Sequence, residues 1–160
     1  ERVLRDETKN IIKIASVLKK SEDIYTVGRG TSYATALEAA LKIKEVSYIH
    51  TEGLAGGELK HGTIALISKG TPCIVFAPQD ETYTAMISNA TEIKARGGVV
   101  IGISSLKSEV FDYWIKVTDL EEASIIAQVV PAQLLAYYLA IGKKLDPDKP
   151  RNLAKSVTVK

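Results

Sequence analysis

The chain has 160 residues, 46% of them hydrophobic and 25% charged, which is enough for one soluble domain with a buried core. Its 21 basic and 19 acidic residues give a net charge of +2, which argues against a protein whose main partner is nucleic acid or an anionic membrane. The single cysteine, Cys73, excludes an internal disulfide framework and fits a reducing, cytoplasmic environment. No apolar run reaches the roughly 18 to 20 residues that span a bilayer, and no signal peptide is visible.

The first half of the chain predicts helices that alternate with short strands. The apolar periodicity of residues 3–20 predicts an amphipathic helix, and the β-rich run at residues 24–28 predicts a buried strand. A glycine turn then leads into a second predicted helix over residues 33–47. Residues 48–56 predict a short strand and loop, and residues 57–62, which lie between glycines, predict a short helix or turn.

The second half continues this alternation. Three more apolar runs predict strands, at residues 72–78, 99–103 and 114–117. Helices are predicted over residues 81–95 and 121–142, where Pro131 either kinks one helix or begins a second. Short apolar strands that alternate with long helices predict an α/β fold, a three-layer α/β/α sandwich around a parallel sheet.

The domain organisation is simple, because the sequence contains no internal repeat, low-complexity tract or linker. Residues 1–145 are predicted to form one domain, and residues 146–160 a polar, extended C-terminal tail. The chain begins at Glu1 without a methionine, which indicates either processing or excision from a longer protein.

A glycine turn follows the first predicted strand, at the end of the sheet where ligands commonly bind in parallel α/β proteins. Gly28 and Gly30 allow a tight turn, and Thr31 and Ser32 add hydroxyl groups at a helix start that suits a phosphate. Tyr33 stands where a dinucleotide fingerprint needs a third glycine, and the Gly-Lys-Ser/Thr ending of a P-loop is absent. Two interpretations of this turn are equally open: a binding site for a phosphate or sugar, and a plain tight turn in which a hydroxyl side chain caps the helix.

Glu38, Lys42 and Glu45 share one face of the second predicted helix, which is otherwise largely apolar. Such a charged stripe is more often the solvent side of a helix. The glycine turn at the start of this helix, however, favours the interpretation that the stripe lines a cleft. His61 has a side chain suited to proton transfer near neutral pH, although a lone histidine is more often structural. The histidines and Cys73 lack metal-ligand spacing, so neither a metal nor another cofactor is predicted.

Six segments occur in this order along the chain: Gly28–Gly30, Leu37–Glu38, Leu41–His50, Gly57–Gly62, Arg96–Gly98 and Pro150–Val159. Together they resemble the corresponding motifs of the glutamine–fructose-6-phosphate amidotransferases (glucosamine-6-phosphate synthases). Nearly the whole chain is similar to the C-terminal half of their isomerase region, which is a sugar isomerase (SIS) domain. This resemblance implies a five-stranded parallel sheet with the flavodoxin-like strand order.

The resemblance also implies roles for individual residues. In that family the residue matching Lys155 forms a Schiff base with the open-chain sugar, and the residue matching Glu45 moves a proton between C1 and C2. The residue matching His61 assists ring opening across a dimer interface. The implied substrate-binding positions are Glu38, Lys42, Arg151, Ala154 and the turn residues Gly28, Gly30, Thr31 and Ser32.

The implied reaction converts fructose 6-phosphate and ammonia into glucosamine 6-phosphate. In the family, an N-terminal glutaminase domain supplies the ammonia and a preceding SIS repeat holds most of the phosphate, and this chain contains neither. The expected partners are therefore these two domains and a second copy in a homodimer. The alternative is a non-catalytic SIS module that senses a phosphosugar, and a nucleotide-binding domain is a distant third.

Overall fold

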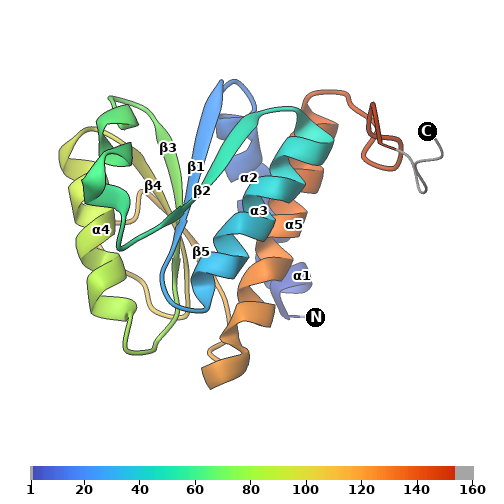
Figure 1. The fold of residues 1–160 in the computed structure, drawn as a ribbon. Helices are drawn as coiled ribbons and strands as arrows, with labels where there is room; N and C mark the ends of the chain where they lie inside the picture. Colours follow the sequence, from blue (N-terminus) through green and yellow to red (C-terminus); the bar gives the residue numbers. More distant parts are fainter. Residues whose placement is uncertain (1, 154–160) are drawn as a thin grey trace, which may run out of the picture.

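A parallel β-sheet forms the centre of the molecule, in a computed structural model that describes residues 2–153. The strands pair in the order β2-β1-β3-β4-β5, and every pair is parallel (Figure 1). Their bounds are β1 Asp23–Gly28, β2 His50–Ala55, β3 Pro72–Ala77, β4 Val99–Ser104 and β5 Tyr113–Lys116. This is the flavodoxin-like order, in which successive connections diverge between β1 and β3. The predicted fold class and strand order are confirmed.

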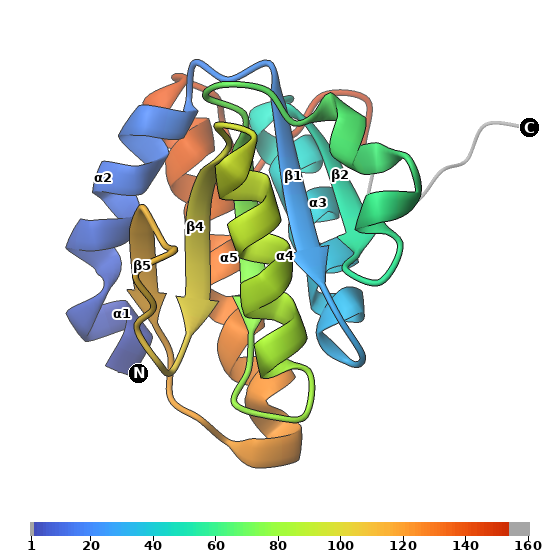
Figure 2. The same ribbon diagram turned by 90° about the vertical axis from the view of Figure 1, so that its left-hand side faces the viewer.

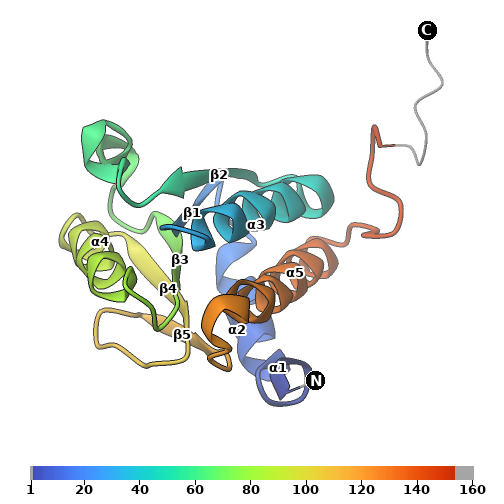
Figure 3. The same cartoon turned by 60° about the horizontal axis from the view of Figure 1, so that its bottom comes forward.

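Helices cover both faces of the sheet. Figures 2 and 3 show α4 on one face and α2, α3 and α5 together on the other. The α-helices are α1 Arg2–Asp6, α2 Thr8–Leu18, α3 Ser32–Ser47, α4 Tyr83–Ala95 and α5 Ser124–Gly142. Short 3₁₀ helices lie at η1 Leu59–His61, η2 Thr63–Leu66 and η3 Glu121–Ala123. The described part of the chain is therefore a three-layer α/β/α sandwich.

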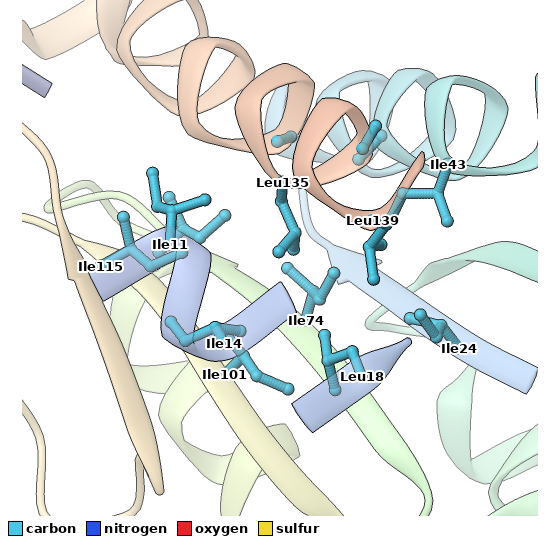
Figure 4. Close-up of a cluster of buried hydrophobic side chains, with 14 of the residues drawn as sticks. Ile11, Ile14, Leu18, Ile24, Ile43, Ile74, Ile101, Ile115, Leu135 and Leu139 are labelled. Carbon is cyan, nitrogen blue, oxygen red and sulfur yellow. The ribbon is translucent and has the colours of Figure 1, made fainter. Parts of the chain in front are cut away.

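The continuous apolar strands are explained by burial on both faces of the sheet. Along β1, Ile24 packs into the cluster under α2, α3 and α5, whereas Tyr25 and Val27 pack into the cluster under α4. Figure 4 shows the first cluster, to which both strands and helices contribute fully buried side chains. Burial of each such Ile or Leu side chain stabilises the fold by about 1.5–3 kcal/mol. This packing holds α3, the helix with the charged stripe, rigidly against the sheet.

Two predicted helices differ in detail from the observed ones. The helix predicted over residues 3–20 is divided at Glu7 into α1 and α2. The Asn10 side chain donates hydrogen bonds to Glu7 Oε2 and to the backbone oxygen of Trp114, which ties this junction to β5. At the other end of the chain, Pro131 neither begins a helix nor ends one, because α5 continues through it with the proline buried.

The prediction that no apolar run reaches a membrane-spanning length is wrong for α5. Among the described residues, α5 is a helix of 19 residues that is long and apolar enough, by length and composition alone, to cross a membrane. In the fold it packs along α2 and α3, and it buries Ala132, Leu135 and Leu139 in the core. Core helices of α/β domains pass the same test, and burial accounts for part of the composition of α5, because 39% of its apolar stretch is buried in the fold.

Gly28 is needed where β1 ends and α3 begins. A Cβ atom at this position would lie 2.1 Å from the backbone oxygen of Ser32 and 2.8 Å from the nitrogen of Tyr33. We expect Gly28→Ala to lower the free energy of unfolding by about 3 kcal/mol, because backbone atoms of α3 must move. Gly57→Ala is the control, since the nearest atom to its Cβ would be 3.7 Å away, in ordinary contact. Urea unfolding measures both, and equal stability of the two variants would contradict the prediction.

Candidate functional site

The predicted stripe on α3 forms a chain of ion pairs. Lys42 Nζ lies 2.7 Å from Glu45 Oε2 and 3.8 Å from Glu38 Oε1. The three side chains are 28–38% exposed, so they are neither buried nor fully solvated. The hydrogen bond to Glu45 raises the pKa of Lys42; partial burial opposes this rise, and the charges of Glu45 and Glu38 add to it. The stripe is therefore a partly covered cluster with a lysine that stays cationic.

The C-terminal tail returns across the end of α3 that carries this cluster. The Arg151 backbone N–H donates a hydrogen bond of 2.8 Å to the Tyr48 hydroxyl, and the Arg151 guanidinium lies 4.1 Å from the centre of the Tyr48 ring. Beneath the tail is a cavity of about 210 Å³, lined by Lys42, Val46, Gln133, Ala136, Tyr137, Pro147 and Asp148. Arg151 and Lys42 are thus brought to one end of α3. Ala154 and Lys155 lie outside the described residues.

His61 lies on the other side of the sheet from α3. It ends η1, whose Leu59 is buried in the cluster under α4, and neighbouring Lys60 pairs with Glu92 of α4 at 2.7 Å. The imidazole is exposed, and its Nδ1 is 3.0 Å from Glu58 Oε2. Within one chain, His61 and Glu45 are therefore held on opposite faces of the sheet.

The glycine turn lies at the carboxyl end of β1, beside a cavity of about 440 Å³. The lining contains Thr31 and Ser32 together with three acidic side chains, those of Asp80, Glu81 and Glu121. Ser32 is fully buried, and its hydroxyl donates a hydrogen bond of 2.9 Å to the buried Gln128 Oε1. This cavity has an acidic lining, and its Ser32 hydroxyl is already bonded within the fold.

Other parts of the described chain add little to this chemistry. Burial raises the pKa of the Cys73 thiol to about 12, so this cysteine is not an activated nucleophile. No group of three His, Cys, Asp or Glu among residues 2–153 is arranged to hold a metal ion. A cavity of about 570 Å³ beside α1 and β5 contains none of the predicted site residues.

Tyr48 and Gln128 were not singled out by the sequence. Tyr48 lies in the matching segment Leu41–His50. Its contact with Arg151 joins residues 103 positions apart, so no local sequence pattern predicts it. Gln128 interrupts an apolar helix, and a buried glutamine in such a helix is a recognisable sign of a specific hydrogen-bond partner.

The fold combines a flavodoxin-like sheet with a charged helix that follows its first strand and a tail that contacts the end of that helix. These features define a class of small-molecule-binding α/β domains. The chain belongs to the SIS domain family, whose pattern matches residues 17–143.

Curated relatives agree with this assignment. A glutamine–fructose-6-phosphate aminotransferase (isomerizing) of Thermococcus kodakarensis is 51% identical over 150 residues, which are 92% of this chain and 25% of that protein. One of Caldanaerobacter subterraneus subsp. tengcongensis is 50% identical over 161 residues, covering 98% of this chain and 26% of that protein. The chain therefore spans about a quarter of the length of these relatives.

Solved structures give the same result. The C-terminal domain of glucosamine-fructose-6-phosphate aminotransferase from Francisella tularensis superposes with a TM-score of 0.83 at 33% identity, covering 92% of this chain and 43% of that one. A glucosamine-6-phosphate deaminase from Thermotoga maritima has a TM-score of 0.71 at 27% identity, covering 94% of this chain and 47% of that one. The chain thus matches the sugar-isomerase part of larger proteins.

Proposed function

We propose that this chain is the C-terminal sugar-isomerase half of an amidotransferase that makes glucosamine 6-phosphate from fructose 6-phosphate and glutamine-derived ammonia. The observation that carries the proposal is the Glu38–Lys42–Glu45 cluster on α3, with the tail that leads to Lys155 folded over its end. The names of the curated relatives support the same reaction.

The reaction defines what the residues must do. Fructose 6-phosphate has its ketone at C2, and the product has nitrogen at C2 and an aldehyde at C1. An amine therefore condenses with the C2 ketone and releases water, and ammonia exchanges with that amine. A proton then leaves C1 and arrives at C2, while the proton of the C1 hydroxyl is lost and one is gained by the nitrogen, which leaves an aldehyde at C1 and an amine at C2. The chemistry requires a nucleophilic lysine and a carboxylate that can reach both carbons.

Lys155 is the better candidate for the nucleophile than Lys42. An imine-forming lysine reacts through its neutral amine, whereas the paired carboxylates raise the pKa of Lys42 and keep it charged. We assign Lys42 instead to orienting Glu45 and to neutralising negative charge that develops on the sugar oxygen. Because its pKa is raised, the ion pair stabilises the fold below the ordinary lysine value of 10.5 and loses this contribution as the pH rises further.

Glu45 is assigned the proton transfer. Its Oε2 is bonded to Lys42, and no described side chain bonds its Oε1, so one oxygen is fixed while the other is available to a ligand. Glu38 lies about two turns earlier on the helix and completes the cluster around Lys42.

We assign the remaining functions to other domains and to a second protomer. The acidic cavity beside the glycine turn disfavours a phosphate dianion, so we propose that a preceding SIS domain holds the phosphate. His61 lies across the sheet from Glu45, which favours its donation to the site of a second protomer for ring opening. A glutaminase domain supplies the ammonia.

A borohydride trap tests the proposal in a reconstituted amidotransferase, meaning the Thermococcus kodakarensis relative with this chain in place of the region that it matches. We expect glucosamine 6-phosphate formation and, after reduction with borohydride, a fructose 6-phosphate adduct on Lys155 detected by mass spectrometry. Binding of fructose 6-phosphate by calorimetry without any adduct or product would reject the enzyme and favour the sensing module.

Lys42→Met in the reconstituted enzyme is expected to lower kcat/KM about a hundredfold, because the charge that orients Glu45 is lost. The stability should change by less than about 1 kcal/mol, since the pair is about one-third exposed. Lys44→Met is the matched control, because Lys44 is exposed on the same helix and makes no ion pair with a described residue. Steady-state kinetics and urea unfolding measure both variants, and equal kcat/KM values would remove Lys42 from the site.

A further inference from the structure

The outer face of α5 is apolar although it is open to solvent. This helix of 19 residues contains no charged side chain, and it packs between α2 and α3 in one layer (Figure 3). Its exposed large side chains form one stripe, the α5 stripe, at spacings of seven, four and four residues: Ile126, Gln133, Tyr137 and Ile141. The three apolar members are 46–65% exposed, whereas the outer face of a surface helix ordinarily carries charged residues. A contiguous apolar stripe of this kind marks an interaction surface.

The α5 stripe borders the charged cluster on α3. Tyr137 lines the cavity of about 210 Å³ together with Lys42, the central member of the cluster. On the other side of the cluster, Leu37 and Leu41 of α3 are 45% and 43% exposed. Leu37 lies against β2, because its Cδ2 atom would be 2.9 Å from a Cβ atom at Gly53. The cluster therefore has apolar side chains on both sides, an arrangement that suits a site which a partner closes off from water.

We infer that this apolar face, the α5 stripe with Leu37 and Leu41, is the surface on which the phosphate-holding SIS domain docks. The inference rests on the proposed function, which assigns the phosphate to that domain. Open-chain fructose 6-phosphate spans at most about 8 Å from C1 to phosphorus, at about 1.2 Å for each single bond of an extended chain. A domain that holds the phosphate while Glu45 reaches C1 must therefore lie over the cluster, and the α5 stripe lies beside the cluster.

Solved relatives contain a region of suitable size for this docking. The match covers 43% of the Francisella tularensis chain and 47% of the Thermotoga maritima chain, so more than half of each chain lies outside it. Ile126 and Ile141 are fifteen positions apart, which corresponds to about 22 Å along a helix. An interface of ordinary size buries about 800 Å² on each partner, a patch about 30 Å across. One domain of this fold is therefore large enough to cover the stripe and the cluster together.

The face of this chain that carries His61 is a poorer match for the α5 stripe. The side chains of Glu58, Lys60 and His61 are 61–74% exposed there. Against an apolar surface these groups would lose water without gaining partners. A second protomer that donates His61 is therefore expected to contact the charged cluster and not the stripe. A contact between the α5 stripes of two copies is the alternative occupant, which the experiment separates.

Photo-cross-linking tests the surface without turnover or substrate. In the reconstituted enzyme, p-benzoylphenylalanine, which reacts with groups that it contacts, takes the place of Ile126 in one sample and of Leu66 in another. Leu66 is the matched control because it is 54% exposed and lines a cavity with residues 21–23, before β1, and with no residue of α3 or α5. Mass spectrometry of the linked peptides then identifies the domain in contact. We expect position 126, but not position 66, to link to the phosphate-holding SIS domain.

A charge on the stripe gives the second measurement. Ile126→Glu in the reconstituted enzyme is expected to raise KM for fructose 6-phosphate at least about tenfold, because an unpaired carboxylate in the interface keeps the phosphate-holding domain away from the cluster. In the 160-residue chain the melting temperature should stay within about 3 °C of the parent value, since the side chain of Ile126 is 65% exposed. Leu66→Glu should match the parent in both measurements.

The outcomes separate the docking surface from the proposed function. Links from position 126 to a second copy of this chain, to a glutaminase domain or to no protein at all would each overturn the docking surface. An unchanged KM in Ile126→Glu would overturn it as well. Links to the SIS domain in an enzyme that forms no glucosamine 6-phosphate would instead reject the proposed function alone, because cross-linking requires only the assembled protein.

Discussion

Replacement of Glu45 by glutamine is expected to lower glucosamine 6-phosphate formation in the reconstituted enzyme by about 10²- to 10⁴-fold, the usual contribution of a positioned general base. Glutamine has nearly the same shape but cannot accept the C1 proton. Its amide oxygen can still accept a hydrogen bond from Lys42 Nζ, but it lacks the negative charge that makes the 2.7 Å contact an ion pair in the parent chain. The adduct on Lys155 should still form, because imine formation precedes the proton transfer. Loss of product together with retention of the adduct would assign Glu45 to this step.

Deuterium labelling sharpens the measurement. A carboxylic acid exchanges its proton with solvent, so the parent enzyme working in D₂O should place some deuterium at C2 of the product, which NMR detects. Glu22→Gln is the control, because Glu22 is exposed in the bend before β1 and takes no part in the ion pairs of the α3 cluster. Turnover of Glu45→Gln within tenfold of the parent would show that another group moves the proton.

Most of the fold could be predicted because its signals are local. The apolar runs of β1, β3 and β4 are continuous, and the helices between them are long enough to cross over a parallel sheet. The features that local signals miss depend on contacts distant in sequence. The break at Glu7 depends on the bond from Asn10 to Trp114, which is distant in sequence. The apolar run of α5 can be read in the sequence, whereas the packing of this helix against α2 and α3 depends on tertiary contacts.

The candidate site was predictable only where it lies on one helix. The spacing of Glu38, Lys42 and Glu45 places them on one face, and the ion pairs confirm that they form a cluster. The Tyr48–Arg151 contact is fixed by the path of the tail after α5, which no periodicity records. Membership of the SIS family is shown by comparison, whereas the roles of Glu45, His61 and Lys155 stay predictions.

Lys155→Ala is expected to have the largest effect, with loss of the borohydride adduct and a fall in product formation of at least about 10³-fold. Its amine nitrogen is the only protein atom that the proposed reaction bonds covalently to the sugar. Lys42 is a poor substitute because its carboxylate partners raise its pKa and keep it protonated. Mass spectrometry of the reduced protein and an assay for glucosamine 6-phosphate measure the two effects separately.

Lys155→Arg distinguishes a nucleophile from a charge. Arginine keeps the positive charge and most of the length of lysine, but it stays protonated at any pH at which the protein is folded, so it cannot form the imine. If Lys155 only attracts the anionic sugar, Lys155→Arg should recover most of the activity that Lys155→Ala loses. If Lys155 forms the imine, the two variants should be equally inactive, and Lys149→Ala, which removes a charge earlier in the tail, should behave as the parent. Recovery by arginine would therefore exclude covalent catalysis and leave electrostatic attraction as the function of the tail lysine.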